Sequence, residues 1–444
     1  MDMVSCGFLN TLEESLKEGK VTEEQINAAC RRVLEAKYKL GLFSDPYKYC
    51  DTLRVEKELY TTAHRAVARE IAAETFVLLK NEDHLLPLER KGKIALIGPM
   101  ADARNNMCGM WSMTCTPSCH GTLLEGIRSA AGDKAEILYA RGSNIYHDAE
   151  LEKGGAGIRP LERGNELQLL DEALHTAARA DVIVAALGEC AEMSGESASR
   201  TELGIPDAQQ DLLKALVKTG KPVVLLLFTG RPLVLNWEDA NVHSILNVWF
   251  GGSETGDAIA DVLFGKVTPG GKLTTTFPRS VGQLPLYYNH LNTGRPDPDS
   301  HSFNRYSSNY LDMSNEPLYP FGYGLSYTNF SYGNLQLSSD VLSRNGELTV
   351  SVTVTNDGDF DGYEIVQMYL HDIYAEISRP VKELKGFERI FLKKGESREV
   401  KFVITEDDLR FYNSGLQYVY EPGEFDVMVG ANSRDVQTER FRAD

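Results

Sequence analysis

The sequence has no apolar run long enough to cross a membrane, because none reaches about 18 residues. Its longer apolar stretches, such as Val223–Phe228, have only the length of a buried strand. Positive charge is also scarce: 46 Lys and Arg oppose 64 Asp and Glu, which gives a net charge of −18. A surface this acidic repels phosphate backbones, so neither a membrane nor a nucleic acid is expected as a partner.

Cysteine is sparse, and its seven residues form an odd number without regular spacing, which argues against a disulfide framework. Cys108, Cys115, Cys119 and His120 lie within 13 residues of one another. Only Cys115 and Cys119 have the spacing of a zinc pair, however, and no second pair follows. We interpret the cluster as a chance grouping in a loop and expect no metal.

Three common signatures are missing: a P-loop, an H-E-x-x-H helix and a G-x-S-x-G nucleophile elbow. The apolar run 94–97 is followed by Gly98 and Pro99 rather than by G-x-G-x-x-G. Because proline removes an amide that a phosphate cradle needs, a flavodoxin-like nucleotide binder is disfavoured and no cofactor is expected.

The composition itself is ordinary, with 42% hydrophobic and 25% charged residues in 444, enough for two or three domains. Residues 1–50 are predicted to be helical, with a capping box at Thr22 and Gln25 and a C-terminal glycine cap at Gly41. Helices this short need a partner to cover apolar residues such as Val33 and Leu34. The chain therefore reads as beginning in the middle of a fold.

Residues 51–285 predict an α/β three-layer sandwich with a mostly parallel sheet. After a helix at about 55–73 and a strand at 75–80, apolar runs at 94–97, 137–139, 182–187, 223–228 and 245–250 alternate with amphipathic stretches such as 166–178 and 207–218. Short Val/Leu/Ile runs that alternate with helices are typical of a sheet of five or six strands covered on both faces.

Residues 286–333 are rich in proline and tyrosine and are predicted to be an ordered linker, in which 319–327 packs as a strap between domains. From about 334 to 444 the apolar period becomes two, as at Leu348, Val350, Val352 and Val354 and again at 365, 367 and 369. About seven short strands in this stretch predict an all-β, fibronectin III-like sandwich.

The loop after the apolar run 182–187 is long and polar, and it carries Glu189, Glu192, Glu196 and Arg200. In an open α/β sheet, ligands gather at the carboxyl ends of strands. Trp111 follows another such strand, where its ring either stacks on a sugar or packs internally. Composition alone does not choose among the three glutamates.

Taken together, these residues resemble glycoside hydrolase family 3, most closely its bacterial β-glucosidases. The motifs that carry the resemblance are spread over nearly the whole length: residues 36–46, 75–81, 85–88, 97–99, 194–200, 249–252, 270–273, 319–327 and 378–387. So many motifs in the same order make the resemblance highly specific.

The resemblance implies a retaining glycosidase with three domains, in which two carboxyl groups lie about 5–5.5 Å apart. A (β/α)8-like barrel supplies the nucleophilic aspartate, and the α/β sandwich supplies the acid/base glutamate, a position that falls on Glu196. Trp111 and Arg200 are then expected to contact the substrate. Residues 1–50 resemble the end of the barrel, with its closing helices; Asp2 is not at the nucleophile position, so no nucleophile is assigned in this chain.

We therefore expect the chain to supply only the acid/base half-site for a β-glucoside or oligosaccharide, as a fragment or with a separately encoded barrel or in a homo-oligomer. Family members of this type are often periplasmic or secreted, and xylosides and other β-linked sugars remain open as substrates. The alternative is a non-catalytic carbohydrate-binding or structural module that uses Trp111 as its sugar platform.

Overall fold

A computed structural model describes residues 2–112, 115–156, 162–296 and 304–444. The chain divides into two compact units, residues 1–64 and 65–444, which are treated separately. Part of the predicted linker, residues 297–303, lies outside the described residues. Within the described part of the chain, no helix has the length and apolar character needed to cross a membrane.

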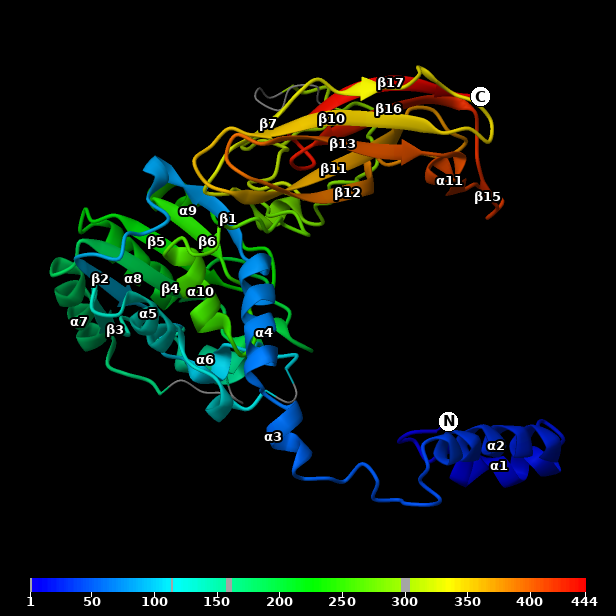
Figure 1. The fold of residues 1–444 in the computed structure, drawn as a ribbon, viewed down its shortest axis with the longest axis horizontal. Coiled ribbons are helices and arrows are strands. Elements are labelled where there is room, and N and C mark those ends of the chain that lie inside the picture. Colours follow the sequence, from blue (N-terminus) through cyan, green and yellow to red (C-terminus); the bar gives the residue numbers. More distant parts are fainter. Residues whose placement is uncertain (1, 113–114, 157–161, 297–303) are drawn as a thin grey trace. The chain divides into compact units, whose positions relative to one another are not determined.

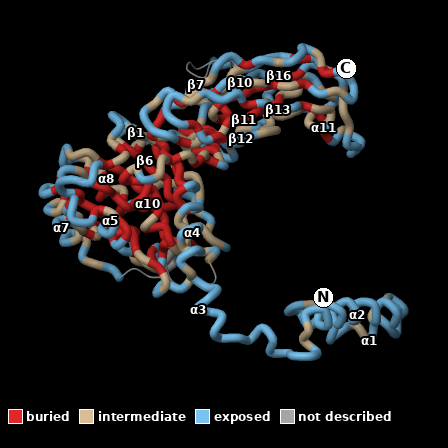
Figure 2. The backbone as a smooth tube through the Cα atoms, in the orientation of Figure 1, coloured by how far each residue is buried: buried red, intermediate tan, exposed pale blue. Residues whose placement is uncertain are grey.

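The first unit consists of the helices α1 (Gly7–Lys17), α2 (Glu23–Lys39) and α3 (Arg54–Glu58). The predicted capping box is confirmed: the Thr22 hydroxyl accepts the Gln25 amide, and the Gln25 side chain accepts the Thr22 amide. Gly41, at φ 73°, ends α2 and donates to the Tyr38 carbonyl at 2.8 Å. Neither α1 nor α2 has a buried residue, as their pale blue colour in Figure 2 shows.

The helix predicted at 55–73 is wrong in its extent, because α3 ends at Glu58 and α4 (Thr62–Thr75) begins separately. Between them Leu59 is extended and Tyr60 has φ 50°. Thr61 accepts the backbone amide of His64 at 3.2 Å, as a helix N-cap does. The local capping bond restarts the helix where the apolar pattern alone predicts continuity.

The second unit begins with a six-stranded sheet of order β1-β6-β5-β4-β2-β3. Every pairing is parallel except that of β1 with β6 at one edge, so the predicted mostly parallel sheet is confirmed. The strands are β1 (Val77–Asn81), β2 (Lys93–Ile97), β3 (Glu136–Ala140), β4 (Val182–Gly188), β5 (Val223–Phe228) and β6 (Ser244–Asn247).

Helices cover both faces of this sheet and complete three layers (Figure 1). One face packs against α4, α5 (Leu123–Ala131) and α10 (Thr255–Leu263), with Phe76, Leu96 and Phe228 in its core. The other packs against α7 (Glu166–Ala178) and α8 (Asp207–Val217), around Ile97 and Leu227. The short helices α6 (Ala149–Ala156) and α9 (Asn236–Asn241) complete this part. Buried residues concentrate in the sheet and its helices (Figure 2).

The strand predicted at 245–250 is shorter than expected, because β6 ends at Asn247. Val248 still donates to the Leu227 carbonyl, but Trp249 has φ 48°, which turns the chain out of the sheet. A left-handed tryptophan is uncommon, and the apolar pattern gives no sign of it.

The strap predicted at residues 319–327 is confirmed by its contacts. On the α/β side, the Tyr323 hydroxyl donates to the Leu79 carbonyl at 3.1 Å, and the Tyr327 hydroxyl donates to Val262 at 2.9 Å. On the opposite side, the Gly322 carbonyl accepts from the Gln367 amide at 3.1 Å. The strap therefore ties the α/β layers to the strands that follow.

Residues 330–443 form the predicted β-sandwich. One sheet has the order β13-β10-β7, with β8 also paired to β10, and the other has the order β12-β11-β16-β17-β9. A small hairpin of β14 and β15 and the helix α11 (Glu406–Leu409) are added to them. The strands are β7 (Phe330–Tyr332), β8 (Gln336–Leu337), β9 (Val341–Leu342), β10 (Leu348–Asn356), β11 (Gly362–Asp372), β12 (Glu383–Leu392), β13 (Ser397–Ile404), β14 (Phe411–Tyr412), β15 (Tyr418–Val419), β16 (Gly423–Gly430) and β17 (Val436–Ala443).

Period two predicts the faces of β10 correctly and those of β11 incorrectly. The residues of β10 predicted to point inward are all buried in the sandwich core: Leu348, Val350, Val352 and Val354. In β11 the core residues are Val366, Met368 and Leu370, not the series 365, 367 and 369. Gln367 and Tyr369 are buried on the other face, against the linker, where Tyr369 meets Tyr288 at 5.9 Å between ring centroids. Because β11 is covered on both faces, its pattern does not show which face is the core.

Candidate functional site

The carboxyl ends of β4 and β5 meet at a buried carboxylate, Glu189, whose side chain has no exposed area. It accepts from the Arg200 Nη1 at 2.7 Å, the Thr229 hydroxyl at 3.0 Å and the Gly230 amide at 3.2 Å. The Arg231 Nε lies 3.1 Å from it, close enough for an ion pair although the angle is not that of a hydrogen bond. Two cations and two further donors thus compensate the desolvation of Glu189.

These two arginines also fix the path of the loop that follows β4. The other Arg200 nitrogen, Nη2, donates to the Gly204 carbonyl at 3.0 Å. Arg231 donates to the Met193 carbonyl and, at 2.7 Å, to the Ala198 carbonyl. Donors from two segments therefore hold both ends of the loop 191–200, so this long polar loop is tied to the sheet edge.

The loop after β2 packs against the middle of this loop. A Cβ added to Gly195 would lie 2.3 Å from Met110 Cγ, so the Met110 side chain packs directly against this glycine. Glu196 and Trp111 follow these two residues. Trp111 is 72% exposed, and Glu196 is exposed too and precedes Ser197, which has φ 58°. The structure thus brings together the two segments that carry Trp111 and Glu196.

The three loop glutamates occupy different environments. Glu189 is buried and ion-paired, Glu192 is half-buried in the short helix η4 (Ala191–Ser194), and Glu196 is exposed. Arg200, with its side chain only 12% exposed, has protein partners on both terminal nitrogens. Only Glu196 presents its carboxylate to solvent, while Arg200 acts in this structure as a partner of Glu189.

Two further titratable groups, Cys190 and Tyr146, lie near the base of the loop. Burial, with a smaller contribution from Glu192, raises the pKa of the Cys190 thiol to about 12, so this thiol is neutral. Burial also raises the pKa of Tyr146, whose hydroxyl lies 4.0 Å from the Met193 sulfur. Neither group is suited to act as a base here.

The cysteine cluster is not a chance grouping in space, which corrects the interpretation from spacing. Cys108 and Cys115 form a disulfide, and His120 Nε2 lies 3.7 Å from Cys108 Sγ. Cys119, which spacing pairs with Cys115, is a free cysteine. This is the one bridge among the described residues, whose other five cysteines form no disulfide.

The fold and this loop define an α/β protein with a carboxylate-bearing loop at the sheet edge and an appended β-sandwich. Residues 76–327 match the glycosyl hydrolase family 3 C-terminal domain, and residues 364–433 match a fibronectin type III-like domain. The first match covers more than half of the chain. The chain belongs to glycosyl hydrolase family 3.

Similar proteins extend over almost all of the chain. A periplasmic beta-glucosidase of Salmonella typhimurium is 46% identical over 99% of this chain and 58% of its own length. A beta-xylosidase of Formosa agariphila is 39% identical over 96% of this chain and 56% of its own. The crystal structure of a Listeria innocua beta-glucosidase in complex with glucose has a TM-score of 0.87 and 37% identity, and the match covers 100% of this chain and 58% of that one. The chain thus spans somewhat more than half the length of these relatives.

Proposed function

We propose that this chain supplies the acid/base half-site of a retaining β-glycosidase, with Glu196 as the acid/base residue and a β-glucoside as the substrate. The observation that carries the proposal is the exposure of Glu196 on a loop anchored at the carboxyl end of the sheet, next to the segment of Trp111. The similarity to beta-glucosidases and to a structure with bound glucose supports the substrate class.

The chemistry requires a carboxyl group that protonates the departing oxygen and later takes a proton from the attacking water. Glu189 is unsuited to it, because its oxygens accept from Arg200 and from donors just after β5, and its side chain has no exposed area. Glu196 is free of this constraint. Arg200 and Arg231 hold the loop backbone, and a misplacement of about 1 Å can cost on the order of 100-fold in rate.

The second carboxylate of the reaction is proposed to come from the part of the relatives that this chain does not span. We expect that the rate of aryl β-glucoside hydrolysis with the purified 444-residue chain does not exceed the uncatalysed rate in buffer. Turnover by the chain alone that disappears in Glu196→Gln would overturn this part of the proposal.

The role of Glu196 is tested in a fusion that joins the uncovered part of the Salmonella relative to this chain. Glu196→Ala should slow hydrolysis of phenyl β-glucoside by about 10²–10⁴-fold, the usual contribution of general acid catalysis. Cleavage of a dinitrophenyl glucoside should slow much less, because its leaving group needs no protonation. Added azide should restore turnover, because this anion attacks the glycosyl intermediate without a general base.

Two matched variants make the assignment specific. Glu202→Ala removes an exposed carboxylate six residues along the chain, and Glu192→Ala removes the half-buried one. In both variants, the hydrolysis rate should depend on the leaving group as it does in the unmodified fusion. If Glu192→Ala gives the azide-dependent behaviour and Glu196→Ala does not, the acid/base role belongs to Glu192.

We propose Trp111 as a platform for the apolar face of a sugar ring, because 72% of its surface is exposed. Trp111→Ala should raise the KM for the glucoside with a smaller effect on kcat. Binding of cellobiose that survives Glu196→Ala but is lost in Trp111→Ala, in a chain that shows no turnover in any fusion, would favour a carbohydrate-binding module instead. The predicted contact between Arg200 and substrate stays a prediction.

A further inference from the structure

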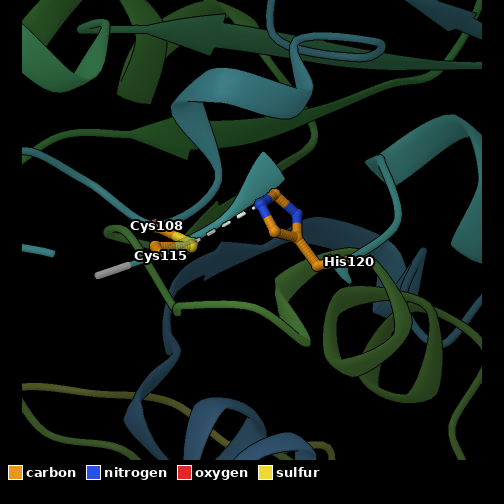
Figure 3. Close-up of side chains that lie close together, drawn as sticks. All are labelled: Cys108, Cys115 and His120. Carbon is orange, nitrogen blue, oxygen red and sulfur yellow. Dashed lines mark hydrogen bonds between the residues drawn. A yellow bond between two sulfur atoms is a disulfide. The ribbon is translucent and has the colours of Figure 1, made fainter. Parts of the chain in front are cut away.

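The side chains of Cys108, Cys115 and His120 lie close together (Figure 3). The two cysteines flank Trp111 in the loop after β2. The two sulfurs and one ring nitrogen all lie within 4.8 Å of one another, and Cys108 Sγ is 3.7 Å from His120 Nε2. Zinc bonds of about 2.3 Å to sulfur and about 2.0 Å to nitrogen, at a tetrahedral angle, place those two atoms about 3.6 Å apart. The sulfur-to-nitrogen spacing is therefore that of two ligands of one metal ion.

The orientation of His120 also suits a ligand. Its Nδ1 lies 3.2 Å from the Gly121 carbonyl oxygen, which can only accept, so Nδ1 carries the proton. The lone pair of Nε2 then faces the two sulfurs. A metal-bound histidine usually donates its other N–H to a carbonyl or carboxylate in this manner.

The contact is hard to explain by the disulfide alone. His120 is only 4% exposed, and in the disulfide neither sulfur has a hydrogen to give to its Nε2. A buried acceptor without a donor is destabilising, because it has lost its hydrogen bond to water. A cation bound to Nε2 and two thiolates removes this cost and neutralises the thiolate charges.

The backbone around His120 is held in place from two sides. Arg65 donates to the Cys119 carbonyl at 2.5 Å, and Arg104 donates to the His120 carbonyl. Thr122 and Glu125 form the capping box that begins α5 just after the histidine. The imidazole is thus positioned by groups other than the cysteines, as a preorganised ligand should be.

We propose that Cys108, Cys115 and His120 form a binding site for a thiophilic divalent cation such as Zn²⁺, and that the disulfide is the oxidised, metal-free form of this site. In the reduced form both thiols lose a proton as the cation binds, and water completes the tetrahedron. In the oxidised form the two sulfurs bond to each other, and neither can act as a thiolate ligand.

The exchange between the forms is a two-electron reaction. Two thiols transfer two electrons and two protons to a disulfide oxidant such as glutathione disulfide, which becomes two thiols. The Cα atoms of Cys108 and Cys115 are 6.4 Å apart, within the range of about 4.4–6.8 Å that disulfides use. Two thiolates on one zinc ion lie about 3.8 Å apart, so side-chain rotation converts one arrangement into the other.

Either form ties the segment that carries Trp111, because this residue lies between the two cysteines. The site thereby sets how firmly the proposed sugar platform is held, a consequence that rests on the proposed function. The metal site itself does not rest on it, because its test contains no substrate.

The test uses the full chain with Cys6, Cys30 and Cys50, its three exposed thiols, replaced by serine. The chain is reduced with a phosphine under nitrogen and titrated with Co²⁺. One equivalent should bind, with the thiolate-to-cobalt and ligand-field bands of a tetrahedral site, and Zn²⁺ should abolish both.

Two comparisons decide the outcome. The same chain oxidised by glutathione disulfide, two hydrogens lighter by mass spectrometry, should bind at least about 100-fold more weakly than the reduced chain. His120→Gln and Cys108→Ser should weaken binding by a similar factor, whereas Cys119→Ser should stay within about threefold. The oxidised-versus-reduced comparison needs no variant at these positions, so it decides even if Cys108→Ser fails to fold. Equal binding by both redox forms, or by Cys119→Ser and Cys108→Ser, would overturn the proposal.

Discussion

Glu189→Gln is the substitution for which the structure allows the effect to be worked out most fully. The carboxylate is buried without exposed area and faces Arg200 and Arg231, whose side chains are 12% and 21% exposed. Glutamine keeps one acceptor for the Thr229 hydroxyl and the Gly230 amide, but it removes the charge and turns an NH₂ group toward a guanidinium. Breaking a buried pair on one side costs about 3–5 kcal/mol, because the remaining charge stays buried without compensation.

For a domain of this size, 1 kcal/mol corresponds to about 2–4 °C in Tm, so the transition of the α/β layers should fall by about 6–20 °C. Calorimetry and urea unfolding followed by far-UV circular dichroism measure this change. Trypsin provides a local readout, since it cuts after Arg200 once the loop opens. A loss of 3 kcal/mol confined to the loop should speed native-state cleavage there by about 100-fold.

Glu202→Gln is the matched control, because it removes the same charge from an exposed position in the same stretch. It should change the free energy of unfolding by less than about 0.5 kcal/mol. If Glu189→Gln behaves like Glu202→Gln in both assays, the two arginines do not anchor the loop through Glu189. The description of the loop as fixed at the sheet edge would then be wrong.

Three further predictions concern charge, reactivity and backbone shape. The Glu166 carboxylate raises the pKa of His147, so protonated His147 stabilises the folded chain fully below pH 6.5, and this stabilisation is lost as the pH rises through the raised pKa. Tm should therefore fall as the pH rises over this range, and His147→Asn should remove this pH dependence of Tm. The Cys190 thiol, with a pKa of about 12, should resist iodoacetamide at pH 8 in the folded chain while peptide mass spectrometry finds the exposed Cys6, Cys30 and Cys50 alkylated. Gly188→Ala should destabilise the chain by at least about 3 kcal/mol in urea unfolding, because its Cβ would lie 2.0 Å from the Phe228 carbonyl oxygen, whereas Gly220→Ala, at φ 72° in open space, should cost about 1 kcal/mol.

The sequence predicts a local feature correctly when that feature depends on one buried face or on residues close in sequence. The alternation at Leu348–Asn356 and the capping box at Thr22 depend on neighbours close in sequence, and both are confirmed. The break at Tyr60 and the end of β6 before Trp249 depend on left-handed residues that carry no sequence signal. The faces of β11 were misassigned because the linker buries its second face. The predicted boundaries at 50, 285 and 333 stay predictions.

The site shows a different limit, because its parts come from strands far apart in the sequence. The sequence places Glu189, Glu192 and Glu196 in one loop, but their burial depends on Arg231, which follows β5 and was not singled out. Its position directly after the neighbouring parallel strand was the signal that could have identified Arg231, because the carboxyl ends of parallel strands meet at one edge of the sheet. The cysteine cluster was interpreted as a chance grouping for the same reason: spacing along the chain tests only short zinc motifs, whereas Cys108 and His120 meet through folding.

The two anchored segments, the loop after β4 and the loop after β2, are held by unlike means, and this bears on how the proposed half-site works. Glu189 is buried and ion-paired with Arg200 and Arg231, and none of the three is a redox group or a thiol, so this anchor of the Glu196 loop does not depend on redox state or metal supply. The Trp111 loop is tied through Cys108 and Cys115, whose bond depends on the redox environment. If both proposals hold, the acid/base group is fixed while the sugar platform is adjustable. In the fusion with the uncovered part of the Salmonella relative, reduction and metal removal should then change the KM for a glucoside. They should leave the leaving-group dependence of Glu196→Ala unaltered, which separates binding from proton transfer in one experiment.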